Sequence, residues 1–123
     1  MSASRATIAV VEDDAGVRAA LQQLLRSAGF AAVAFAAAEE FLSEARDGGV
    51  DLLIADVNLP DMTGVALLAT LAERGARVPA VLMTGRDDPA TRDLVRQAGD
   101  VPCLHKPFSD RELFDAIERV GRR

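Results

Sequence analysis

The sequence contains no apolar run of the roughly 20 residues that a membrane-spanning helix needs. Its N-terminus, Met1-Ser2-Ala3-Ser4-Arg5, also lacks the apolar segment of a secretory signal peptide. These absences argue against the integral membrane and secreted classes. We therefore expect a cytoplasmic protein with no attachment to a membrane.

Cysteine and clustered basic charge are equally scarce. The single cysteine, Cys103, excludes an internal disulfide and leaves no second thiol for a zinc site or a redox pair. Its expected role is that of a small apolar side chain in the core, with redox sensing as the alternative. The net charge of -5 and the lack of a basic cluster argue against binding to a nucleic-acid backbone.

Lysine is almost absent as well. Lysine and arginine together number 14, yet Lys106 is the only lysine. Because the sequence uses arginine for its other positive side chains, the lone lysine suggests a position that needs a compact ammonium group on a flexible stem. The alternative interpretation of this imbalance is chance.

What the sequence does contain is a regular alternation of strand and helix patterns. Apolar runs predict strands at residues 6–11, 30–35, 50–55, 79–83 and 101–105. Amphipathic segments predict helices between Asp14 and Gly29, over 39–46, and between Thr63 and Gly75, Asp88 and Gly99, and Ser109 and Gly121. This alternation predicts one domain, 1–123, of the α/β class: a doubly wound, parallel sheet with helices on both faces.

Two of the predicted helices have weak signals. Segment 39–46 has a narrow apolar face and no good N-cap. The helix after Asp88 offers only Leu94, Val95 and Ala98 as apolar positions, so we expect it to be held loosely. Pro102 favours an edge position for the last strand, because proline cannot donate a hydrogen bond to a neighbouring strand.

Polar side chains follow four of the predicted strands, and the carboxyl ends of parallel strands meet at one edge of a sheet. These residues are Glu12 and Asp13, Asp56, Thr84 and Lys106. Carboxylates brought together repel unless a cation lies between them, and an all-oxygen ligand set favours Mg²⁺. An aspartate in such a site can act as a covalent nucleophile for a phosphoryl group, with the lysine and the threonine stabilising the transferred charge.

Each of these positions has an ordinary alternative when it is taken alone. Acidic residues at 12–14 are common at the start of a helix, and Asp56 is then a polar residue that ends a strand. Thr84-Gly85 and Lys106-Pro107 are weak turn signals. Their coincidence at the same ends of successive strands favours a shared site.

Four motifs carry a resemblance to a known family. They are Val10-Val11-Glu12-Asp13, Asp51 to Asp56 followed by Leu59-Pro60-Asp61-Met62-x-Gly64, Met83-Thr84-Gly85, and Lys106-Pro107-Phe108. With them the chain resembles the receiver domain of a two-component response regulator. The resemblance implies the CheY-like, flavodoxin-like (βα)5 fold with strand order 2-1-3-4-5.

The same resemblance implies roles for the residues at the strand ends. Asp56 would accept the phosphoryl group from a phosphohistidine of a sensor histidine kinase or phosphotransfer protein. Glu12, Asp13 and Asp56 would bind Mg²⁺ together with the backbone carbonyl of Asn58. The domain would catalyse only its own phosphorylation and dephosphorylation, and Asn58 and Arg86 would tune the hydrolysis step.

The resemblance also assigns the switch. Thr84 would turn its hydroxyl toward the phosphoryl group, Lys106 would be the ion partner of that group, and the Lys106-Pro107 bond is often cis in the family. The family usually has an aromatic residue three positions before the lysine, which moves with the threonine. Here Cys103 stands at this switch position, and Glu12 stands where aspartate is frequent. His105 is expected to be a surface or interface residue.

Two alternative functions remain at this stage. A phosphohydrolase of the haloacid dehalogenase type uses similar residues, but it places the nucleophile after the first strand with an acid two positions later, where this chain has Asn58. A degenerate receiver would act only as a binding module. The expected partners are the kinase and either a downstream protein or an output domain outside this chain, and a phosphorylation-dependent dimer is a further expectation.

Overall fold

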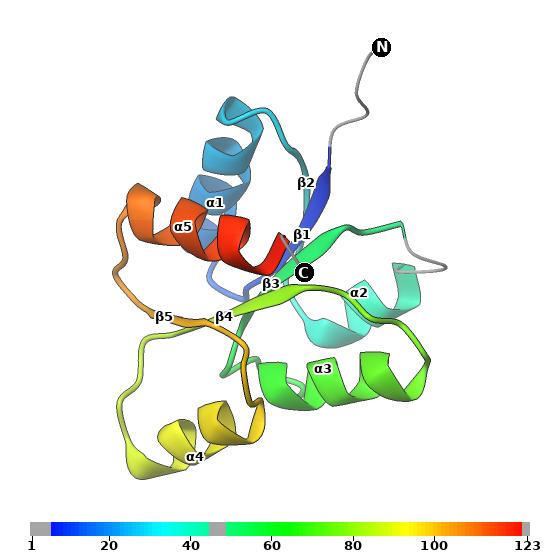
Figure 1. Ribbon diagram of the computed structural model, residues 1–123, viewed down its shortest axis with the longest axis vertical. Coiled ribbons are helices and arrows are strands. Elements are labelled where there is room, and N and C mark those ends of the chain that lie inside the picture. The colour runs from blue at the N-terminus through cyan, green and yellow to red at the C-terminus, as the bar shows by residue number, and fades with distance from the viewer. Residues whose placement is uncertain (1–5, 45–48, 122–123) are drawn as a thin grey trace.

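The computed structural model describes residues 6–44 and 49–121, in which strands and helices alternate (Figure 1). The strands are β1 (Thr7–Val11), β2 (Ala31–Phe35), β3 (Leu52–Asp56), β4 (Ala80–Thr84) and β5 (Cys103–His105). The helices are α1 (Ala15–Ser27), α2 (Ala38–Glu44), α3 (Gly64–Glu73), α4 (Pro89–Gln97) and α5 (Asp110–Gly121). The end of the predicted helix 39–46 lies outside the described residues.

The strands form a single parallel sheet in the order β2-β1-β3-β4-β5. The predicted fold class and strand order are thereby confirmed. The edge position expected from Pro102 is also correct, because β5 pairs with β4 alone. The strands begin one or two residues later than predicted, and β3 and β4 extend to include Asp56 and Thr84.

Alternate residues along each central strand contribute to two separate cores. One face of the sheet packs against α1 and α5, through residues such as Val10, Ile54 and Leu113. The other face packs against α2 and α3, with the partly buried apolar residues of α4 at its margin. Every residue of β3 is buried, which explains why its sequence is a continuous apolar run up to Asp56.

Several predicted helix ends are formed as expected. Asp14 caps α1 through a hydrogen bond from the Val17 N–H, and Ser109 and Glu112 form the reciprocal capping box of α5. Helix α3 begins directly after Thr63 as predicted, and the Thr63 hydroxyl caps it by accepting the Ala66 N–H. Among the helices of the described part of the chain, none has the length and apolarity to cross a membrane.

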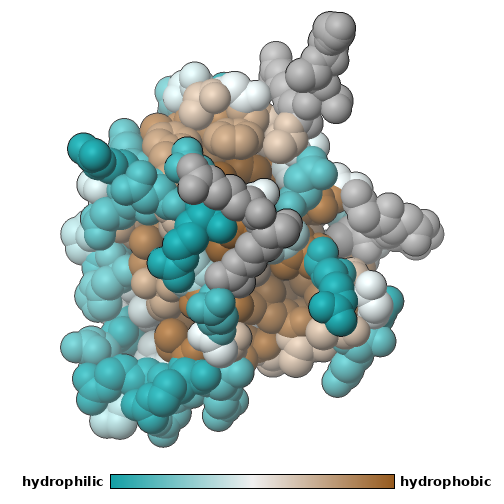
Figure 2. All heavy atoms as spheres, in the orientation of Figure 1, coloured by the Kyte–Doolittle hydropathy of each residue, from teal (hydrophilic) through white to brown (hydrophobic). Residues whose placement is uncertain are grey.

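Helix α4 differs from the other long helices in its anchoring. Thr91 is its only buried residue, whereas Leu94, Val95 and Ala98 are half-buried. Figure 2 shows hydrophilic side chains gathered over the region that α4 occupies in Figure 1. The sequence-based expectation of a narrow apolar face agrees with this arrangement.

Candidate functional site

The polar residues predicted to meet are brought together at the carboxyl edge of the sheet. Asp56 and Thr84 are the last residues of β3 and β4, while Glu12 directly follows β1 and Lys106 directly follows β5. The parallel pairing of these strands aligns their ends, so residues far apart in the sequence share one site.

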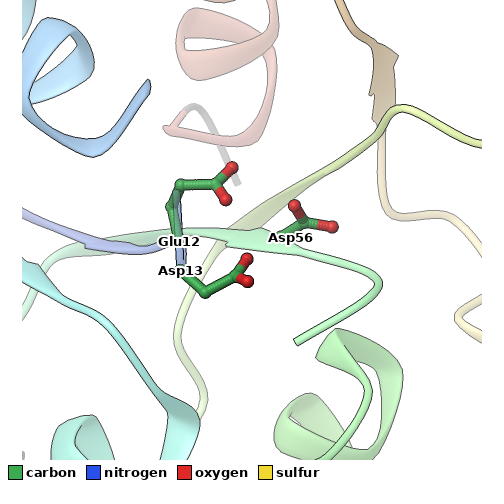
Figure 3. Close-up of side chains that lie close together, drawn as sticks. All are labelled: Glu12, Asp13 and Asp56. Carbon is green, nitrogen blue, oxygen red and sulfur yellow. The ribbon is translucent and has the colours of Figure 1, made fainter. Parts of the chain in front are cut away.

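Three carboxylates form the acidic part of this site. Each of Glu12, Asp13 and Asp56 offers one oxygen, and these oxygens all lie within 4.8 Å of one another. Their carboxylate groups point toward a common space in Figure 3. Glu12 and Asp56 are 1% and 5% exposed, whereas Asp13 is exposed. The site is therefore a buried acidic pair with one carboxylate open to solvent.

The ammonium group of Lys106 lies between the two buried carboxylates. Its Nζ is 2.5 Å from Glu12 Oε1 and 2.6 Å from Asp56 Oδ2. Burial alone would lower the pKa of Lys106, but the hydrogen bonds to Asp56 and Glu12 raise it above its ordinary value. Lys106 is therefore charged at neutral pH and offsets the repulsion between its two partners.

The pKa of Glu12 is raised by some of its surroundings and lowered by others. Burial raises its pKa, and the charge of Asp56 acts in the same direction. The hydrogen bonds from Lys106 and from the Asp14 N–H lower the pKa, but the net shift is upward. The physical cause is that a carboxylate in a poorly solvated position holds its proton more readily.

The loop after β3 fixes the second oxygen of Asp56 and the hydroxyl of Thr84. Asp56 Oδ1 accepts a hydrogen bond from the Asn58 N–H at 2.8 Å. Thr84 Oγ1 donates to Asn58 Oδ1 at 3.2 Å and accepts from the Arg86 N–H at 3.0 Å. The loop packs so closely that a Cβ placed on Gly64 would be 2.5 Å from the Asp56 carbonyl oxygen.

The donor set fits a hard divalent cation. It consists of carboxylate oxygens without histidine or cysteine, and one of the carboxylates remains exposed to solvent. Mg²⁺ is usually bound by one or two carboxylates while it keeps several waters, so an open acidic site of this kind suits it. Figure 3 shows that the three side chains approach this space from the ends of two neighbouring strands.

Comparison with known proteins shows the family to which the chain belongs. The family model described as the response regulator receiver domain matches residues 8–118 of the chain. The chain belongs to this receiver domain family. Among curated relatives, it is similar to the transcriptional regulatory protein FixJ of Rhizobium meliloti, with 36% identity over 115 residues. It is also similar to nodulation protein W of Bradyrhizobium diazoefficiens, with 35% identity over 122 residues.

Coverage of these relatives is unequal. The alignments span 94% and 99% of this receiver domain but 56% and 54% of FixJ and nodulation protein W. The chain thus spans about half the length of these curated relatives. Among solved structures, FixJ-N has a TM-score of 0.82 and 32% identity, covering 98% of this chain and 97% of that chain.

A second solved structure extends the likeness. The CheY-like receiver domain protein from Methanospirillum hungatei JF-1 has a TM-score of 0.85 and 25% identity, covering 97% of this chain and 95% of that chain. The agreement covers nearly all of both chains. The receiver fold therefore accounts for the whole alternating pattern of strands and helices.

Cys103, which the resemblance assigns to the switch position, lies in β5 beside α4. Cys103 is half-buried, and His105 is exposed as predicted. Together with Thr84 and residues of α4 they line a hollow of about 450 Å³. Burial, with the charge of Asp56 adding to it, raises the pKa of the Cys103 thiol. A thiol that stays protonated is a poor redox sensor, so this environment favours the apolar role.

One residue near the site was missed by sequence reasoning. Asp61 accepts the N–H groups of Ala38 at 3.2 Å and Glu39 at 2.8 Å, so it caps α2 from the loop after β3. Burial is the largest single influence and raises the pKa of Asp61, but the hydrogen bonds from backbone N–H groups, those of Glu39 and Ala38 first, together lower it below its ordinary value of 3.8. The missing N-cap of this helix is thus supplied by a residue more than 20 positions away.

Proposed function

We propose that Asp56 accepts a phosphoryl group from the phosphohistidine of a sensor histidine kinase or of a phosphotransfer protein. A carboxylate oxygen of Asp56 forms the new O–P bond while the N–P bond of the donor breaks and leaves its electron pair on the imidazole nitrogen. The observation that supports this role is the contact of Asp56 with Lys106 beside Glu12 and Asp13.

The surrounding side chains have distinct roles in this proposal. Lys106 orients Asp56 through their ion pair, and its Nζ is close enough to follow a phosphoryl oxygen attached there. The Thr84 hydroxyl donates a hydrogen bond to that group in the phosphorylated state. Glu12, Asp13, Asp56 and the Asn58 carbonyl would hold Mg²⁺, which supplies positive charge beside the phosphoryl oxygens.

The readout in this proposal is a change of a protein-docking surface and not turnover of a substrate. The domain catalyses only its own phosphorylation and dephosphorylation, in the cytoplasm. FixJ is named a transcriptional regulatory protein and is about twice as long as the aligned region. We propose that the partner is likewise either an output domain of a longer regulator or a separate protein, with dimerisation on phosphorylation as one form of the response.

In this proposal the readout differs from that of the family at Cys103, where the family usually has an aromatic residue. A cysteine is too small to occupy the space of an aromatic ring, and the hollow beside Thr84 lies next to it. The proposed consequence is that movement of Thr84 is transmitted to α4 through fewer apolar contacts than an aromatic residue would make. In this proposal Cys103 couples Thr84 to α4 more weakly than an aromatic residue at the same position would.

The central test is intact-mass analysis after incubation with acetyl phosphate and Mg²⁺. We expect a single phosphoryl adduct on the wild-type chain and none on Asp56→Asn, because an amide is not a competent nucleophile. Asp115→Asn, which changes an exposed acid on α5, is the matched control and should label like wild type. An unlabelled wild type would leave the degenerate binding module as the function, and continuous release of phosphate would indicate a hydrolase.

A further inference from the structure

Within the described part of the chain, Asn58 is the one residue whose hydrogen bonds reach both the carboxylate of Asp56 and the side-chain hydroxyl of Thr84. Its backbone N–H donates to Asp56 Oδ1 at 2.8 Å, and its side-chain Oδ1 accepts from Thr84 Oγ1 at 3.2 Å. The proposed metal contact uses only the backbone carbonyl of Asn58. The side-chain contact with Thr84 therefore has no role in the function proposed above.

The Thr84 hydroxyl has a single hydrogen to donate. Its oxygen already accepts the Arg86 N–H at 3.0 Å, and its hydrogen can be directed to Asn58 Oδ1 at 3.2 Å or to the Arg86 carbonyl at 3.4 Å. In the described part of the chain it makes no hydrogen bond to Asp56. Donation to a group on Asp56 consequently requires that the hydroxyl first leave its present acceptor.

The backbone around Asn58 is firmly held, so its side chain is the movable part. Asn58 forms an isolated bridge with Thr63, and the Gly64 N–H donates to the Val57 carbonyl at 2.9 Å. The close approach of Gly64 to the Asp56 carbonyl closes the same loop. A change of hydrogen-bond partner by Thr84 can therefore occur without moving the loop.

We propose that the Asn58 carboxamide is the resting-state acceptor of the Thr84 hydroxyl and competes with the phosphoryl group for it. Asn58 thereby acts as a positioning residue through Thr84, and this inference rests on the proposed phosphorylation of Asp56. A charged phosphoryl oxygen is a stronger acceptor than a neutral amide oxygen, so the exchange is favourable once the group is present. Before that, the Asn58 contact stabilises the inactive orientation.

A double-mutant cycle tests this competition. Beryllofluoride with Mg²⁺ serves as the stand-in for a phosphoryl group on Asp56, and its affinity is measured by titration of amide NMR signals. We expect Asn58→Ala to tighten binding by about 2- to 10-fold, the range set by loss of one competing neutral hydrogen bond. In a Thr84→Val background the same substitution should change the affinity little, because the hydroxyl is gone.

Unchanged or weaker binding by Asn58→Ala would overturn the inference, as would an equal change in the Thr84→Val background. The amide spectra of all variants without ligand establish that each is folded. Failure of the wild type to bind beryllofluoride would instead contradict the proposed function.

A second measurement needs no ligand and separates the two proposals. Three-bond couplings to the Thr84 methyl group report the side-chain rotamer of the free protein. We expect one dominant rotamer in the wild type and in Asn58→Asp, which keeps an acceptor oxygen, and rotamer averaging in Asn58→Ala. The same dominant rotamer in Asn58→Ala would overturn the role of Asn58 whether or not Asp56 is phosphorylated.

Discussion

Thr84 lies between two regions that are held in different ways. The Asp56 side, formed by β3, the loop 57–63 and α3, contacts Lys106, whose ion pair with Asp56 has exposed side-chain fractions of 22% and 7%. On the α4 side, residues 85–99, the ion pair of Arg92 with Asp87 has exposed fractions of 54% and 72%. The first region is fixed by buried polar contacts, and the second by contacts that water can replace.

This difference separates the proposed chemistry at Asp56 from the proposed docking surface at α4. Exposed ion pairs contribute about 0–1 kcal/mol each, so α4 gains little stability from them. Its apolar residues are half-buried, whereas Leu67 and Leu71 of α3 are buried. A nucleophile needs a fixed position, and a docking surface needs an element that can shift at low cost. The two sides of Thr84 meet these requirements separately.

The largest expected effect compares one substitution in the two regions. Leu67→Ala removes a side chain that is 0% exposed in α3, and we expect a loss of about 2–5 kcal/mol in the free energy of unfolding. Leu94→Ala, at a half-buried position of α4, should cost about 1 kcal/mol because its neighbours and solvent can fill the space. Urea titration followed by circular dichroism measures both values.

Equal losses for these two variants would break the comparison, because α4 would then be as firmly packed as α3. The slopes of the urea transitions should stay the same. A change of slope would point to the unfolded ensemble and not to local packing.

A smaller effect is expected where the Asp56 side is packed to backbone contact. In Gly64→Ala the new Cβ would be 2.5 Å from the Asp56 carbonyl oxygen, so the loop or α3 must shift, at a cost of about 1–3 kcal/mol. Gly85→Ala is the control at the start of the α4 side, where the nearest atom is Lys106 Cδ at 3.9 Å. Thermal melts should show a lower Tm for Gly64→Ala and a nearly unchanged Tm for Gly85→Ala, and the reverse order would contradict the packing difference.

The sequence was sufficient to predict the fold and the convergence of the polar residues. The parallel α/β sheet and the meeting of its strand ends follow from local patterns, since each apolar run predicts a strand, whereas the strand order came from the family resemblance. Asp56 and Lys106 could be placed at one edge for this reason, although they are 50 positions apart.

The contacts within the site could not be predicted in the same way. Two contacts show this. The loop residue Asn58 accepts a hydrogen bond from Thr84 of β4, and the loop residue Asp61 caps α2. No short sequence period encodes such contacts between distant segments. Glu12 illustrates the same limit. The sequence offered Glu12 only as a candidate metal ligand and Lys106 only as an ion partner of the phosphoryl group, so their direct contact was not predicted. Side-chain partners depend on loop conformation, and that is fixed by packing across the whole sheet.

The smallest effect concerns Asp61, which ties the Asp56 side to α2 by accepting the N–H groups of Ala38 and Glu39. We expect Asp61→Ala to lower the free energy of unfolding by about 0.5–2 kcal/mol at neutral pH, the usual loss when an N-cap is removed. Asp61→Asn, which keeps an acceptor oxygen without the charge, should lie between wild type and Asp61→Ala in urea titrations.

The pH dependence of the free energy of unfolding tests whether the charge of Asp61 causes this stabilisation. Because the pKa of Asp61 is lower in the folded chain than its ordinary value of 3.8, the ionised form stabilises the fold fully above that value. This contribution is lost as the pH falls through the lowered pKa, where the folded-state carboxylate is also protonated. The stability difference between wild type and Asp61→Asn should therefore stay constant from neutral pH down to about 3.8 and shrink below it. A difference that persists unchanged in acid would mean that the charge of Asp61 does not contribute to its capping of α2.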